Sequence, residues 1–196
     1  MEFHMNAAYK YISDVVNSDA NVTEGMKKII SYCSSYCASS IWGKIMNLDF
    51  EGDKYNLMEW MQYNLTNDPL SNEVDALWFG LFNGVLEDDE VCVLYLSGIN
   101  CVNNGKENMG WDFEHQYLPE HRYADSKVLN DISIMLKNEG GVVSRVGEYI
   151  IYLGYTCLVI ANILKELDKV ALLRQRSVLV GFDSGDYIQL KPIVTI

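Results

Sequence analysis

Apolar residues recur every three or four positions through the first third of the chain, which is the spacing of amphipathic helices. One helix is predicted over residues 5–16, a second with an apolar stripe from Met26 to Ile45, and a shorter third over residues 55–65. Asn21 or Thr23 can cap the second helix, and Glu24 stands three residues after Asn21, in the capping-box position. We therefore expect residues 1–68 to be helical.

The periodicity then changes to short runs rich in aromatic and β-branched residues. Residues 76–83 and 91–97 form two such runs on either side of an acidic stretch, which predicts a β-hairpin. Gly80, inside the first run, indicates a bulge or the close approach of another part of the backbone. Residues 177–182 and 187–190 flank a second set of turn-forming residues and predict a second hairpin.

Two further helices are expected between the hairpins. Asp125 or Ser126 can cap the first, which ends before two consecutive glycines. The second covers roughly residues 145–168 and is apolar enough to raise the question of a membrane span. Glu148 lies inside the apolar stretch and Lys165 follows it directly, so we favour a buried central helix.

These elements predict an α+β fold: a small antiparallel sheet made from two hairpins, packed against about five helices, one of them long and buried. A chain of 196 residues can form one domain with a full core. We therefore interpret residues 1–196 as a single α+β domain, in which residues 1–68 are the helical part and residues 74–196 hold the sheet and two helices.

Charge is placed unevenly along this order. The chain has 27 acidic and 15 basic residues, a net charge of −12. Between Glu51 and Asp125 there are 15 acidic and three basic residues, so this middle region holds the whole surplus and the remainder is neutral. An acidic protein attracts basic partners and repels phosphate backbones, which argues against nucleic-acid binding.

Residues 111–125 form the least regular segment and contain two of the three histidines. His115 and His121, with nearby carboxylates, could hold a divalent metal or form the site of a small-molecule enzyme. Their spacing is not typical of zinc sites, however, and a structural loop with Arg122 paired to a carboxylate is the alternative. Because no motif for nucleotide binding, metal hydrolysis or acyl transfer is present, we expect no cofactor and assign no catalytic or metal-binding residue.

The five cysteines also suggest no metal or redox site. Their odd number, the absence of a CxxC pair and a start without a signal-peptide pattern are typical of reduced thiols in the cytoplasm. Cys33 and Cys37 would share a helix face, where free cysteines usually serve as small core residues.

Four stretches in the last 120 residues support a family resemblance: Tyr95–Gly98, Arg122–Ser126, Tyr149–Tyr155 and Gly181–Gly185. In these stretches the chain resembles small acidic bacterial proteins, some of which are immunity proteins that accompany polymorphic or contact-dependent toxins. The resemblance implies a cytoplasmic protein that binds a cognate toxin and blocks it. It assigns no role to any individual residue.

The leading hypothesis is therefore a non-catalytic immunity protein that binds a basic toxin domain through its acidic surface. The predicted partner-binding residues are Glu87, Asp88, Asp89, Glu90, Trp111, Asp112, Glu114 and Tyr117. The four acids between the first two strands would steer the encounter and the aromatic residues would anchor it. Neither a nucleic acid nor a membrane is expected as partner. The oligomeric state stays open, since the aromatic strand over residues 77–82 could also form an interface between copies.

Overall fold

The structure, a computed structural model, describes residues 4–86, 89–100, 115–167, 176–183 and 186–190. Its helices are α1 (Met5–Val16), α2 (Val22–Tyr36), α3 (Ile41–Met46), α4 (Phe50–Asn67), α5 (Lys127–Glu139) and α6 (Gly141–Glu166). Its strands are β1 (Ala76–Leu86), β2 (Asp89–Ile99), β3 (His115–Tyr117), β4 (Tyr123–Ala124), β5 (Ser177–Phe182) and β6 (Tyr187–Leu190). The predicted α+β class is confirmed.

Both predicted hairpins are present in one sheet. Its strand order is β3-β2-β1-β5-β6, and β4 also pairs with β2. β1 and β2 pair antiparallel over their whole length, and β5 pairs antiparallel with β6 from Val178 to Gly181. β1 and β5 pair in parallel, with Phe79 opposite Val180, so the sheet is mixed and not purely antiparallel as expected. The long crossover through α5 and α6 supplies the connection that a parallel pair requires.

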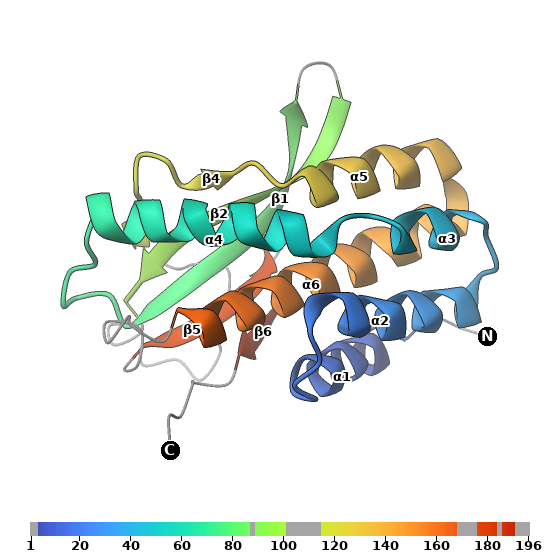
Figure 1. The fold of residues 1–196 in the computed structure, drawn as a ribbon, viewed down its shortest axis with the longest axis horizontal. Helices are drawn as coiled ribbons and strands as arrows, with labels where there is room; N and C mark the ends of the chain where they lie inside the picture. The colour runs from blue at the N-terminus through green and yellow to red at the C-terminus, as the bar shows by residue number, and fades with distance from the viewer. Residues whose placement is uncertain (1–3, 87–88, 101–114, 168–175, 184–185, 191–196) are drawn as a thin grey trace.

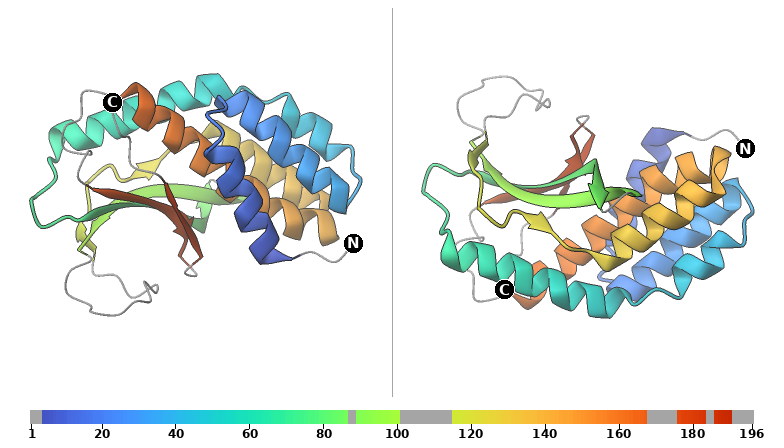
Figure 2. Two further views of the ribbon diagram at one scale, coloured as in Figure 1. Left: turned by 90° about the horizontal axis from the view of Figure 1, so that it is seen from below. Right: turned by 90° about the horizontal axis from the view of Figure 1, so that it is seen from above.

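The described helices lie to one side of the sheet and past one of its ends (Figures 1 and 2). Alternation along β1 turns Leu77, Phe79 and Leu81 toward these helices, where they join the main core. α6 runs through the middle of this core, and most of its side chains are buried. By length and composition alone α6 could cross a membrane. However, 78% of its most apolar 18-residue stretch is buried inside the protein, as in the core helix of a soluble domain.

The sequence pattern was correct about the caps. Asn21 Oδ1 accepts a hydrogen bond from Glu24 N at 2.8 Å, and Ser126 Oγ accepts one from Leu129 N at 3.1 Å. Gly140 precedes α6 with a φ of 67°, in the region that favours glycine. α6 begins directly after it, four residues earlier than the apolar run alone indicated.

Two predicted helix boundaries were wrong. The stripe from Met26 to Ile45 is not one helix, because α2 ends at Tyr36 and α3 begins at Ile41. Ser39 Oγ accepts a hydrogen bond from Ile41 N at 3.1 Å, which satisfies a donor at the start of α3. The third helix is longer than predicted, since Asp49 caps it by accepting from Gly52 N at 3.0 Å.

Gly80 occupies a regular position in β1, opposite Tyr95, so both expectations were wrong: the strand has no bulge there, and the atoms that come close belong to side chains and not to another part of the backbone. A Cβ atom at this position would overlap the Tyr95 ring and the Trp78 indole.

We expect Gly80→Ala to lower the free energy of unfolding by about 1–3 kcal/mol through overpacking. Urea denaturation measures this, with Gly43→Ala as the control: Gly43 lies in α3 with no atom in the way, and alanine there should be neutral or stabilising by up to about 1 kcal/mol. Equal effects at the two glycines would contradict the packing argument.

Candidate functional site

The carboxylates of the acidic middle region do not gather on one face. Asp75 lies just before β1, whereas Asp89 and Glu90 begin β2 at the far end of the same hairpin. The 11 residues of β1 separate them by on the order of 35 Å. Glu51 and Glu59 lie on α4 instead. A partner therefore meets several separate acidic areas, and the surrounding side chains distinguish them.

One of these areas is the hairpin end, by which we mean residues 82–86 of β1 and 89–93 of β2. It projects beyond the helices at the top of Figure 1. Val85 is 72% exposed and Leu86 is 49% exposed, and the carboxylates of Asp89 and Glu90 stand beside them on the paired strand. Lys137 approaches Asp89 to only 3.8 Å at an exposed position, so it offsets little of this charge. Glu87 and Asp88 lie outside the described residues.

Three aromatic rings adjoin the hairpin end on the sheet face that points away from the core. Phe82, Tyr95 and Tyr123, the aromatic trio, come from β1, β2 and β4, with ring centroids 5.9 to 6.3 Å apart. Tyr123 is 53% exposed, and the Arg122 guanidinium lies 4.8 Å from the centre of its ring. Tyrosine and arginine are the residue types that most often dominate the affinity of protein interfaces.

An acidic residue is fixed beside the trio. The Tyr95 hydroxyl donates a hydrogen bond to Asp183 Oδ1 at 2.7 Å, and Asp183 N donates to the Leu81 carbonyl at 3.1 Å. Burial, together with the neighbouring Asp183 carboxylate, raises the pKa of Tyr95 well above its usual range. Tyr95 therefore stays a neutral donor at physiological pH. The carboxylate of Asp183 is thereby held at the side of the trio.

Tyr117, one of the predicted anchor residues, is buried in the fold and does not lie on the surface at the hairpin end. It is only 7% exposed, and its hydroxyl donates to the Asp68 carbonyl at 2.8 Å. This contact ties β3 to the end of α4, and packing accounts for the ring. Of the trio at the hairpin end, Tyr123 is exposed, whereas Phe82 and Tyr95 are half-buried. Trp111, Asp112 and Glu114 lie outside the described residues.

The histidines do not meet at a metal site. His115 Nδ1 lies 2.9 Å from Ser97 Oγ, but Ser97 is fully buried and offers no accessible nucleophile. Partial burial lowers the pKa of His115 below its usual value. The His121 ring packs edge-on against Tyr63. Across the part of the chain that the structure describes, no three His, Cys, Asp or Glu side chains are grouped to hold a metal ion.

Asp53 was not identified from the sequence, although it is the most deeply buried carboxylate described, at 4% exposure. Its Oδ2 accepts hydrogen bonds from Tyr155 at 2.5 Å and Ser126 at 2.6 Å, and its Oδ1 accepts one from Lys127 N at 2.9 Å. Burial, and then the Asp53 charge, raise the pKa of Tyr155 well above its usual value. The spacing to Leu57, one turn on, could have shown that Asp53 lies on the buried stripe of α4.

A cavity of about 370 Å³ lies between α4 and α5, and Asp49, Asp53 and Asp131 help to line it. The contacts of these three residues explain why the lining is acidic. Asp49 caps α4, and Asp53 accepts from the first N–H of α5. The positive ends of two helices stabilise these two carboxylates, and Asp131 pairs with Lys127 at 2.6 Å. Each of these acids therefore has a structural role: Asp49 and Asp131 stabilise their own helices, and Asp53 links α4 to α5 and α6.

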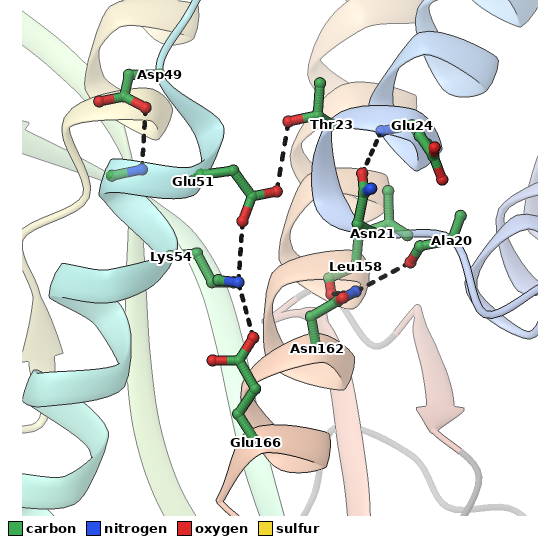
Figure 3. A network of polar contacts seen from close by, with 11 residues as sticks. Ala20, Asn21, Thr23, Glu24, Asp49, Glu51, Lys54, Leu158, Asn162 and Glu166 are labelled. Atoms are coloured by element: carbon green, nitrogen blue, oxygen red, sulfur yellow. Dashed lines mark hydrogen bonds and ion pairs between the residues drawn. The ribbon is translucent and has the colours of Figure 1, made fainter.

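Lys54, one of the three bases of the middle region, is used inside the fold. Its Nζ lies 2.9 Å from Glu51 and 2.8 Å from Glu166, which links α4 to α6 (Figure 3). In the same view Asn162 Nδ2 donates to the Ala20 carbonyl at 3.3 Å. These contacts hold the helical layer together and leave the charge of the hairpin end unchanged.

Comparison of the chain with protein-family models, with curated proteins and with solved structures found no match.

Proposed function

We propose that this protein is a non-catalytic binding protein, an immunity-type inhibitor that neutralises a cognate bacterial toxin by holding a basic surface of it. The observation that supports the proposal is the hairpin end with its aromatic trio. Exposed side chains, Val85, Leu86 and Tyr123 among them, lie there near Asp89, Glu90 and Asp183, and the trio is on the face of the sheet opposite the described helices.

The two kinds of side chain would act differently on binding. Exposed carboxylates on a projecting hairpin raise the rate at which a basic partner arrives, and they contribute less to the affinity of the final complex. Aromatic rings that are already packed against each other lose little conformational freedom when they are covered, so they supply much of the affinity. A protein with this division of roles associates quickly and inhibits by covering its target.

The test uses a toxin-like protein encoded by a neighbouring reading frame, where the genome has one, as the partner. We expect the variant Asp89→Asn/Glu90→Gln to reduce the association rate by about three- to tenfold at low salt and to change the dissociation rate little. The rate for the unaltered protein should fall as salt is raised through the physiological range. Stopped-flow fluorescence or surface plasmon resonance measures both rates.

Asp68→Asn/Glu73→Gln is the matched control, because it removes the same charge outside the hairpin end. It should change the association rate by less than about twofold. An association rate that does not depend on salt, or one that both double variants reduce equally, would contradict a role for the hairpin end.

A further inference from the structure

The outer edge of β1 is unpaired over the hairpin end. β5 pairs with β1 only from Ala76 to Leu81, whereas β1 continues to Leu86. Along residues 82–86, β1 therefore has one strand neighbour, β2, among the described residues. An exposed strand edge of this kind is the template for pairing with a further strand.

The hydrogen-bond pattern shows which backbone groups are available. Leu81 O accepts from Asp183 N on the outer side of β1, so the backbone groups of Leu81 point away from β2. Backbone groups alternate along an antiparallel pair, so the N–H and C=O of Asn83 and Val85 also point outward. The pattern on β2 agrees, since Cys92, which stands opposite Asn83, donates its N–H outward to Ser133 Oγ at 2.8 Å. In the described part of the chain, no hydrogen bond links two strands at Asn83 or Val85.

Proteins usually protect such an edge with a lysine, a proline or a bulge. Residues 82–86 contain none of these, and the register with β2 is regular throughout. Carboxylates instead lie near both ends of this part of β1: Asp183 follows β5 at its base, and Asp89 and Glu90 stand opposite Leu86 and Val85 on β2 at its tip. A second copy of this chain would bring the same acids together, whereas a basic segment would meet charges of opposite sign.

From these observations we infer that the β1 edge from Phe82 to Leu86 binds an extended, lysine- or arginine-bearing segment of the partner by strand addition. This inference rests on the proposed function and specifies its geometry. Asn83 and Val85 supply the backbone hydrogen bonds, and the alternate side chains of the added segment reach the flanking carboxylates. Strand addition obtains its affinity from such main-chain bonds and its specificity from such side-chain contacts.

A capped hexapeptide of alternating lysine and valine is the probe. We expect it to slow hydrogen exchange at the amides of Asn83 and Val85 in the full chain, measured by NMR. A copy of the peptide that is N-methylated at alternate residues, and a copy with glutamate in place of lysine, should each bind at least about tenfold more weakly.

Val85→Pro removes an outward N–H and leaves the β1–β2 ladder its donors, so it should weaken peptide binding about tenfold, with Val85→Ala within about threefold. The amides of Gly84 and Val91 report whether the hairpin still forms. If the hairpin does not form in Val85→Pro, the difference in affinity between the plain and the N-methylated peptide, measured on the unaltered protein, decides whether the peptide binds by strand addition.

Binding that ignores N-methylation and Val85→Pro, but is lost in Asp89→Asn/Glu90→Gln, would overturn strand addition and leave the proposed function standing. No chemical-shift change at the hairpin end at millimolar peptide would contradict both. Protection of Asn83 and Val85 without peptide, in a protein that light scattering shows to be a dimer, would overturn the inference in favour of self-pairing.

Discussion

Replacing Asp53 by alanine should lower the free energy of unfolding by about 3–4 kcal/mol, one of the largest effects expected of a single substitution in this chain. The carboxylate is buried, and it accepts hydrogen bonds from Tyr155, Ser126 and the backbone of Lys127. Removing it leaves two buried hydroxyl groups with fewer partners and one part-buried backbone N–H without its acceptor. Equilibrium unfolding in urea, followed by circular dichroism, measures the loss.

Two matched variants separate the network from its individual contacts. Tyr155→Phe removes one donor and keeps the ring, so it should cost about 1–1.5 kcal/mol. Asp49→Ala removes an exposed helix cap one turn before Asp53, and should cost about 1 kcal/mol. If Asp53→Ala costs no more than Asp49→Ala, then Asp53 does not join the three helices as described.

Periodicity was a good guide to the elements because each one buries a face whose spacing is visible within a few residues of sequence. α1 begins and ends where the apolar spacing predicts, and both hairpins form between the predicted runs. The pattern failed where a local hydrogen bond decides the boundary. Apolar spacing continues through residues 37–40, but the Ser39 and Trp42 side chains bond to the backbone there, and the chain leaves the helix.

The arrangement of the elements was harder to predict, because it depends on contacts between distant residues. The parallel pairing of β1 with β5 joins segments about a hundred residues apart. The aromatic trio likewise comes from three strands, and nothing in the local pattern around Tyr123 indicates that it meets Phe82. Tyr117 and Tyr123 stand on the same irregular segment, yet one is core and the other is exposed.

The position of the charged residues in the fold was also hard to predict from the sequence. Fifteen acidic residues lie in the middle of the chain, between Glu51 and Asp125, and this clustering in sequence predicts one acidic face. A strand of 11 residues then carries part of the region to the opposite end of the sheet. The acids that matter for the proposed interface include Asp183, which lies far outside the acidic region in sequence. A sum of charge over sequence therefore predicts the sign of a partner better than the place where it binds.

The second large effect is a loss of stability at alkaline pH. Burial raises the pKa of the Cys33, Cys92 and Cys157 thiols and of the Tyr152 and Tyr155 hydroxyls above their ordinary values. In the unfolded chain the thiols ionise near pH 8.5 and the phenols near pH 10. Between those values and the raised pKa values, the folded protein binds more protons than the unfolded chain, so its stability falls as pH rises.

Each such group lowers the free energy of unfolding by about 1.4 kcal/mol per pH unit within its window. Three thiols together give a slope of about 4 kcal/mol per unit above pH 9, and the two tyrosines add to it above pH 10. A domain with about 5–15 kcal/mol of stability should therefore unfold between about pH 10 and 12. Urea denaturation at pH 7, 8, 9 and 10 measures the slope, and tyrosinate absorbance at higher pH shows whether ionisation coincides with unfolding.

Variants identify which groups cause the loss. Cys157→Ala should reduce the slope between pH 9 and 10 by about a third, because Cys157 is one of the three buried thiols. Tyr63→Phe, at an exposed position on α4, should leave the slope unchanged. Stability that stays constant from pH 8 to 10 would mean that the thiols are not shielded from water in the folded protein. Since α6 contributes Cys157, Tyr152 and Tyr155, such a result would also contradict its place as the buried centre of the fold.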